Sequence, residues 1–167
     1  MKAQISFVEF LTSIIIFITF VGYFSLQILI FIPSYINEIK GEGLRSEAFQ
    51  VSELLINDPG QPLDWNINFA NAKRIGLLDQ TQNKTNLLSG SKISAFNSSC
   101  QQNYDNVKNL MGIDNDFSLI MISGSETKIS CSPPVTITRQ IQTVIRRLIA
   151  YDDGGTIKYG ELILQMW

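Results

Sequence analysis

The sequence predicts an α+β protein in which one long N-terminal helix precedes a small head with an antiparallel sheet and short helices. Three observations predict this fold class. Residues 10–33 contain no charged residue. Apolar positions then recur at helical spacing as far as residue 55, and two long extended segments near the C-terminus flank the turn sequence Asp152-Asp153-Gly154-Gly155. Residues 58–167 remain for the head, which is enough chain for one small domain.

Residues 10–33 are expected to form a helix that crosses a membrane. At about 1.5 Å per residue the helix is about 35 Å long, whereas the hydrocarbon core of a bilayer is about 30 Å thick. The alternative, a helix buried in a soluble protein, needs a larger core than this chain can build. The apolar run exceeds the roughly 7–15 residues of a secretory signal, and no small-residue cleavage pattern follows it. We therefore expect a retained anchor.

The charges that flank the anchor indicate its orientation. Lys2 and the initial amine precede the apolar run. Glu38, Lys40 and Glu42 follow it and together carry a net negative charge. Because positive charge is retained on the cytoplasmic side, this balance favours a cytoplasmic N-terminus and an extracellular head.

The residues before the anchor are Lys2-Ala3-Gln4-Ile5-Ser6, followed two residues later by Glu9. This arrangement resembles the N-terminus of archaeal type IV pilin-like proteins, in which a prepilin peptidase removes a class III signal peptide ahead of the glutamine. The resemblance implies that residues 1–3 are a leader, that the bond between Ala3 and Gln4 is cut, and that Glu9 serves assembly. The family pattern Gln-x-Ser-x-Glu has one residue between serine and glutamate, whereas this chain has two.

Glu9 has two interpretations. At headgroup level beside Lys2 a carboxylate costs little free energy, and this is the simpler interpretation from the residues alone. The pilin resemblance implies instead that Glu9 pairs with the new N-terminal amine of Gln4 on a neighbouring subunit.

Residues 34–57 are expected to continue the same helix as a stalk, so that helix and stalk together span 4–57. Pro33 can kink the helix, and Gly41 and Gly43 weaken it. Beyond them one helical face carries an apolar stripe, which we expect to lie on the head: Leu44, Ala48, Val51 and Leu55. The sequence Asn57-Asp58-Pro59-Gly60 then ends the helix. Two separate helices with a flexible joint at 41–43 remain an alternative.

The head, 58–167, begins with a turn-rich segment. Pro59-Gly60-Gln61-Pro62-Leu63-Asp64-Trp65 precedes Arg74-Ile75-Gly76-Leu77, an arrangement that also resembles the head of archaeal pilin-like proteins. From the residues alone, we expect Trp65 to pack on the head core with its indole N–H bound to a carbonyl.

The rest of the head alternates short helices and strands. We expect a helix that begins near Ser89 or Ser91 and carries Ile93, Phe96 and Cys100, and a second from Asp105 to Met111 that ends at Gly112. Strands are expected over 116–122 and 127–132. Alternation from Val135 to Thr143, an extended core segment from Val144 to Tyr151 and a return strand from Ile157 predict a long hairpin.

The composition offers little for catalysis. The chain has no histidine and a net charge of -2, so that histidine bases and a basic nucleic-acid footprint are lacking. Ser89-Gly90-Ser91-Lys92 matches S-x-x-K without its companion motifs and is interpreted as a helix cap plus a solvated lysine. Asp114-Asn115-Asp116 lacks the glycine and glutamate of a calcium loop and is interpreted as a turn. We expect no enzymatic activity, no cofactor and no nucleic-acid partner.

Two kinds of covalent modification are expected of an exported head. Cys100 and Cys131 are the only cysteines and can form one disulfide; two unpaired buried thiols are the alternative. Asn83 and Asn97 each begin an N-glycosylation sequon.

The pilin resemblance implies a structural protein, a major or minor subunit of an archaeal type IV pilus-like cell-surface filament. Its partners would be the membrane, copies of itself or other pilin subunits, and a prepilin peptidase. The alternative is a single-pass, membrane-anchored extracellular binding protein that does not polymerise.

Overall fold

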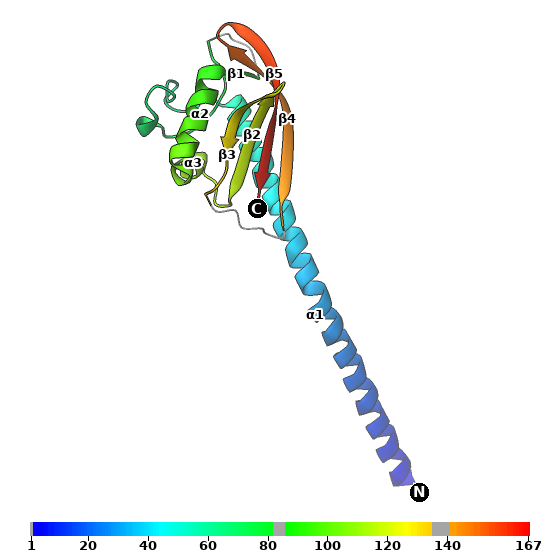
Figure 1. Ribbon diagram of the computed structural model, residues 1–167. Helices are drawn as coiled ribbons and strands as arrows, with labels where there is room; N and C mark the ends of the chain where they lie inside the picture. Colours follow the sequence, from blue (N-terminus) through cyan, green and yellow to red (C-terminus); the bar gives the residue numbers. More distant parts are fainter. Residues whose placement is uncertain (1, 82–85, 135–140) are drawn as a thin grey trace. The chain divides into compact units, whose positions relative to one another are not determined.

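The computed structural model describes residues 2–81, 86–134 and 141–167, with side chains from residue 7 onward. The described chain forms one long helix, a short 3-10 turn, two further helices and a five-stranded sheet (Figure 1). In chain order these are α1 (Lys2–Asn57), η1 (Phe69–Asn71), β1 (Leu87–Ser89), α2 (Gly90–Gln102), α3 (Tyr104–Met111), β2 (Phe117–Ser123), β3 (Glu126–Cys131), β4 (Thr143–Asp153) and β5 (Thr156–Met166). The α+β class predicted from the sequence is confirmed.

Helix α1 is unbroken through Pro33, Gly41 and Gly43, so the alternative of two separate helices is wrong. By packing, however, the chain divides into two compact units, residues 1–40 and 41–167. The second unit, which we call the head, therefore begins inside the predicted stalk of residues 4–57. The physical reason is that the end of α1 is part of the head core.

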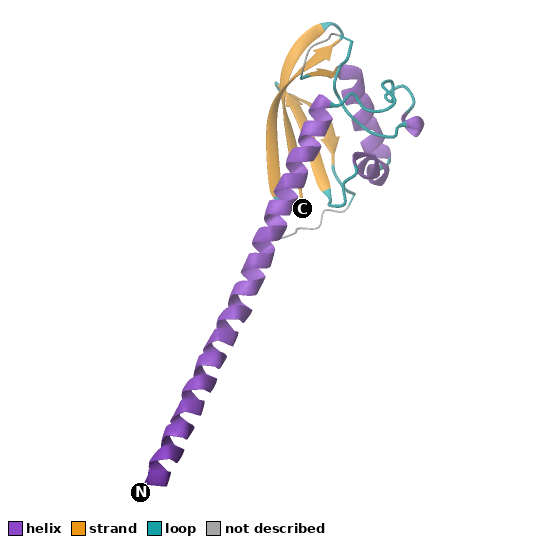
Figure 2. Cartoon of the chain, turned by 180° about the vertical axis from the view of Figure 1, so that it is seen from behind, coloured by secondary structure: helices purple, strands orange, loops and turns teal. Residues whose placement is uncertain are grey.

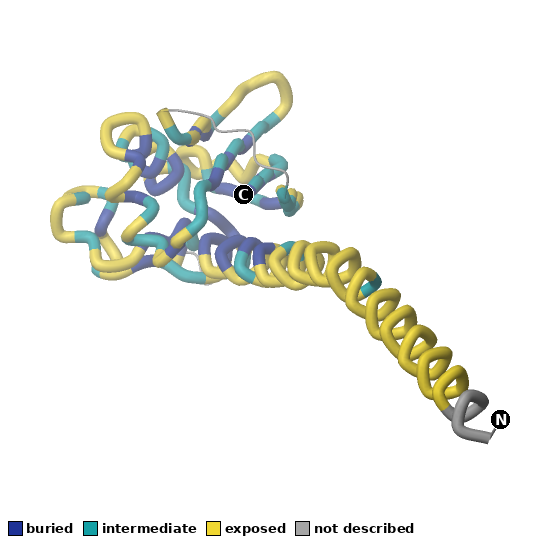
Figure 3. Tube along the Cα trace, turned by 90° about the horizontal axis from the view of Figure 1, so that it is seen from below, coloured by how far each residue is buried: buried dark blue, intermediate teal, exposed yellow. Residues whose placement is uncertain are grey.

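The end of α1 contributes one complete face to that core. Leu44, Ala48, Val51 and Leu55 are all buried, which confirms the apolar stripe expected from helical spacing. Figure 3 shows the change along the helix, from exposed in its first part to buried on one side in the head.

The sheet has the strand order β1-β4-β5-β2-β3. Neighbouring strands are antiparallel except β1, which pairs in parallel with β4. The head part of α1 lies across one face of the sheet, and α2 and α3 lie beside it on the same face (Figures 1 and 2). We call this the inner face and the opposite one the outer sheet face.

Strand register places large apolar side chains in rows on the inner face. Leu119 of β2 stands opposite Leu164 of β5 and opposite Cys131 of β3. All three are buried, and they join the same core cluster as Phe96 of α2 and Leu55 of α1. One hydrophobic core therefore unites the end of α1, α2, α3 and all five strands.

The sequence predictions for the strands are confirmed in part. The hairpin of β4 and β5 turns at Gly154-Gly155, as expected. Strand β1 was not predicted, and Val144, expected in the core, is 49% exposed because it points to the outer sheet face. The alternating segment 135–140 lies outside the described residues.

Candidate assembly and binding surfaces

The first unit presents an apolar helix surface. No charged residue lies between Glu9 and Glu38, and α1 is long and apolar enough to cross a membrane. Large apolar side chains from Phe7 to Ile39 are exposed, and none of the residues in the apolar window is buried. Exposed apolar surface of this extent requires lipid or another protein around it.

The threonine hydroxyls of this helix are already satisfied. Thr12 Oγ1 donates to the carbonyls of Val8 (3.0 Å) and Glu9 (2.9 Å), and Thr19 Oγ1 donates to the carbonyl of Ile15 (2.8 Å). Because these bonds stay within one helix, both side chains can face lipid without leaving a polar atom unpaired.

The residues expected to serve processing and assembly lie at the start of α1. Ala3 and Gln4 are within the helix, but their side chains lie outside the described residues. Glu9 is exposed and is the last charged residue before the apolar surface. Its pairing with an amine of a second copy stays a prediction.

A disulfide links α2 to β3. Cys100 and Cys131 are bonded, with their Cα atoms 5.6 Å apart, and both side chains are buried. The bridge expected from the two cysteines is therefore present in the structure.

The two sequons fall in different settings. Asn97 lies on α2, where its Oδ1 accepts a hydrogen bond from the backbone N–H of Ser130 at 2.9 Å. It therefore ties α2 to β3 close to the disulfide. Asn83 lies outside the described residues, and glycosylation of both sites stays a prediction.

The segment 58–79, which we call the Trp65 loop, is fixed around one indole. Trp65 is fully buried, and its Nε1–H donates to the carbonyls of Gly76 (3.0 Å) and Pro59 (3.2 Å), as the sequence predicts. A Cβ at Gly60 would lie 2.5 Å from the indole, and a Cβ at Gly76 would collide with the carbonyl oxygen of Asp58. Both glycines therefore permit the close approach.

Lys92 corrects the sequence interpretation of a solvated lysine. Its side chain is 7% exposed, and Nζ donates to the carbonyls of Pro59 (2.6 Å) and Leu78 (3.1 Å). Burial lowers the pKa of Lys92, while the carboxylates of Asp79 and Asp58 oppose that shift. The ammonium group thus fastens α2 to both ends of the Trp65 loop.

The other residues of the two motifs make structural contacts. The hydroxyls of Ser89 and Ser91 are 2.9 Å apart, and Ser89 is the N-cap residue of α2, although its side chain makes no capping hydrogen bond. Asn115 Nδ2 donates to Glu47 Oε2 of α1 (2.7 Å), and Lys108 pairs with Asp116 (2.7 Å). These contacts hold the end of α3 and the start of β2 against α1.

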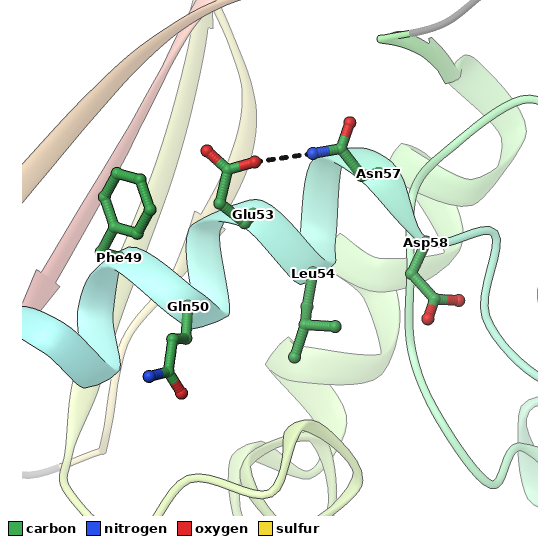
Figure 4. A pocket seen from close by; sticks show the side chains of 6 residues that line it. All are labelled: Phe49, Gln50, Glu53, Leu54, Asn57 and Asp58. Carbon is green, nitrogen blue, oxygen red and sulfur yellow. Dashed lines mark hydrogen bonds between the residues drawn. The ribbon is translucent and has the colours of Figure 1, made fainter.

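Arg147 reaches from the inner face of β4 to α1. Its guanidinium lies over the ring of Phe49, 4.6 Å from the centroid, and pairs with Glu53. An open groove of about 470 Å³ lies along the end of the same helix (Figure 4). It is lined by five residues of α1 and by the residue that follows the helix: Phe49, Gln50, Glu53, Leu54, Asn57 and Asp58. Two apolar side chains of α1, Phe49 and Leu54, are therefore exposed on the surface of the head as well.

The outer sheet face is the surface that sequence reasoning missed. Leu148 is 92% and Tyr159 77% exposed. Near them Arg146 and Glu161 form an ion pair at 3.4 Å. The alternation of side chains along β4 could have indicated this face. It did not show which set of residues faces the core, because both faces of the strand carry apolar residues.

Comparison with known protein families, curated proteins and solved structures found no match to this chain.

Proposed function

We propose that this chain is a structural subunit of a cell-surface filament of the archaeal type IV pilus kind. In this proposal segment 10–33 of α1 is held in the membrane after synthesis, and the assembled filament later surrounds it with the same segment of other copies. The head stands outside the cell and forms the filament surface.

The single observation that carries the proposal is the exposed apolar helix of the first unit. Its side chains are stable only in an apolar environment, which lipid and a bundle of identical helices both provide. Each square ångström of apolar surface kept from water is worth about 25 cal/mol in either setting. Transfer from membrane to filament therefore need not expose that surface to water.

The head supports an extracellular location. Its disulfide belongs to an oxidising compartment, and its hydrophobic core is built from its own residues. A head that folds around its own core can stand outside the membrane while segment 10–33 of α1 remains inserted.

The second candidate is a membrane-anchored extracellular binding protein that does not polymerise. The outer sheet face favours it, because Leu148, Tyr159 and Val144 together present apolar surface on the head. In this candidate the exposed strands bind an extracellular partner, and α1 only anchors the chain.

Co-expression of the full chain with an archaeal prepilin peptidase separates the two candidates. The filament proposal expects loss of residues 1–3, which intact-mass measurement of the purified protein detects. Substitution of Gln4 by a bulky residue at the cut bond is the matched control and should block the cleavage. An intact N-terminus in the presence of active peptidase would favour the plain anchor.

Glu9→Gln tests the assembly step separately from processing. The variant keeps the size of the side chain and removes its charge, so membrane insertion should be unchanged while filament yield falls. Filaments at the wild-type level would exclude pairing of Glu9 with a neighbouring amine.

A further inference from the structure

We propose that one face of α1, rich in phenylalanine and centred on Gln27, is the contact between two parallel copies of the chain within the membrane. The inference rests on the proposed function in one respect, that α1 spans a membrane and associates with itself. It adds which face makes the contact and which residue sets its register.

The face follows from spacing in the sequence. Nine positions are separated alternately by three and four residues, the repeat that keeps a line of side chains facing a second helix. We call them the seam: Phe10, Ser13, Phe17, Phe20, Phe24, Gln27, Phe31, Ser34 and Glu38. The opposite side of the helix carries the aliphatic residues Leu11, Ile15, Ile18, Leu26 and Leu29, together with Gly22 and Ser25. The helix therefore separates an aromatic and polar face from a face suited to lipid.

In the structure the seam carries projecting aromatic rings and a groove beside them. The rings of Phe20 and Phe24 lie in contact, with centroids 4.7 Å apart. A groove of about 590 Å³ runs along one edge of the seam. The seam residues Phe24, Gln27, Phe31, Ser34 and Glu38 line it, together with Ile28, Ile32 and Tyr35 beside the seam. Large rings beside small serines let the side chains of a second helix fit between them.

Gln27 identifies the occupant of that groove. It lies five to six residues from the middle of segment 10–33, or about 8 Å along the helix, which is inside a hydrocarbon core of about 30 Å. Unlike Thr12 and Thr19, its side chain makes no hydrogen bond with the described residues. An amide left unpaired in lipid costs several kcal/mol by transfer scales, so Gln27 requires a partner from another molecule.

A second copy of this chain supplies that partner. All copies insert in the same direction, so two seams meet in parallel and place Gln27 opposite Gln27. An amide carries both donors and acceptors and can therefore pair with itself. A single polar residue on such a seam also fixes the register of the two helices, because any other register leaves it unpaired.

Disulfide cross-linking in lipid vesicles tests the face. The full chain is reconstituted without any assembly machinery, with one introduced cysteine per variant, while Cys100 and Cys131 remain bonded to each other. After oxidation we expect dimers from the seam variants Phe24→Cys and Phe31→Cys, several-fold above those from Leu26→Cys and Leu29→Cys. Equal yields on both faces, a higher yield on the aliphatic face or no dimers at all would overturn the proposal.

The role of Gln27 is tested by energy transfer between labelled copies in the same vesicles. Gln27→Leu should weaken self-association about 3- to 18-fold, which corresponds to the mean and the maximum measured for single interhelical hydrogen bonds in a membrane protein. Ser25→Leu removes a polar group at nearly the same depth on another face and should leave the association unchanged. Unaltered association of Gln27→Leu would overturn the register role.

The seam proposal and the filament proposal can be rejected independently of each other. Cross-links confined to the seam in cells that never form filaments would support the seam and reject the filament. Filaments without preferential cross-linking in vesicles would reject the seam and leave the filament in place.

Discussion

Tyr104 joins two segments of the head through its hydroxyl group. The side chain is buried, its ring stacks on Phe117, and its hydroxyl both donates to the carbonyl of Phe117 (3.0 Å) and accepts from the N–H of the same residue (2.8 Å). Burial is the main cause that raises the pKa of Tyr104 to about 12. The residue therefore provides a titratable probe of the head core.

Alkaline pH should destabilise the head through Tyr104. In the unfolded chain the tyrosine loses its proton near pH 10, whereas in the folded head it keeps the proton up to about pH 12. Between these values the folded state binds more protons, so its contribution to stability is complete below pH 10 and is lost as pH rises. We expect a loss of about 1 kcal/mol at pH 11.

The measurement is chemical unfolding of the full chain in detergent at pH 9 and pH 11, followed by the fluorescence of Trp65 and Trp167, which are both buried in the head. Tyr104→Phe is the matched control, because other titrating groups are common to both proteins. Its stability should fall less than that of the wild type between the two pH values. An equal fall in both proteins would show that Tyr104 does not carry the effect.

Lys92 should contribute to stability through the carbonyls it satisfies. Lys92→Met keeps the length of the side chain but leaves the carbonyls of Pro59 and Leu78 without this donor. We expect a loss of about 2 kcal/mol in the free energy of unfolding, since the Leu78 carbonyl is left without a donor, which costs about 1–3 kcal/mol, while the Pro59 carbonyl keeps Trp65 Nε1–H. Lys158→Met, which removes an exposed lysine paired with Asp153, should leave the unfolding midpoint nearly unchanged. Similar midpoint shifts for both variants would contradict the assigned role.

At the scale of residues, sequence reasoning predicted contacts set by local chemistry and missed those set by tertiary position. Trp65 was expected to bury its ring and bond its N–H, because a large aromatic with one donor has few other stable arrangements. Lys92 was expected to be solvated, because nothing near it in sequence shows that the carbonyls of residues 59 and 78 converge on its ammonium group.

At the scale of elements, helix and strand boundaries were predicted correctly where glycine turn signals coincide with the end of a periodic apolar pattern. Helix α3 ends at Gly112 in the left-handed conformation, and the β4–β5 hairpin turns at two glycines with positive φ, both at expected positions. Strand β1 is only three residues long and exists through pairing with β4. A strand this short carries no alternation from which its presence could be inferred.

The bond between α2 and β3 should be the strongest single tie in the head. Cys100 and Cys131 are 31 residues apart, a closed loop for which the chain-entropy model gives about 3–4 kcal/mol. The double variant Cys100→Ser/Cys131→Ser should lose roughly this much stability, measured by denaturant unfolding of the full chain. A reducing agent should destabilise the wild type and leave the double variant unaffected. Equal stability of variant and wild type would show that α2 and β3 are held by the remaining core.

At the scale of the whole molecule, two compact units share one helix. Residues 1–40 carry exposed apolar surface, while residues 41–167 bury a core of their own. The sequence predicted both properties. An uncharged apolar run of this length indicates a membrane helix by composition alone, and the remaining residues are enough for one small domain. The beginning of this unit at Gly41 was harder to predict: helical spacing indicated that the stripe at residues 44–55 lies on the head, but only tertiary contacts show that these residues are part of its core.

The most direct test of the account is electron cryomicroscopy of surface filaments sheared from cells that express this chain with a prepilin peptidase and an assembly system. The account predicts filaments built from this chain, with each subunit beginning at Gln4, segment 10–33 of many copies packed in the centre, and the heads outside. Cells that hold the protein only in their membranes, with filaments that do not contain it, would contradict the account.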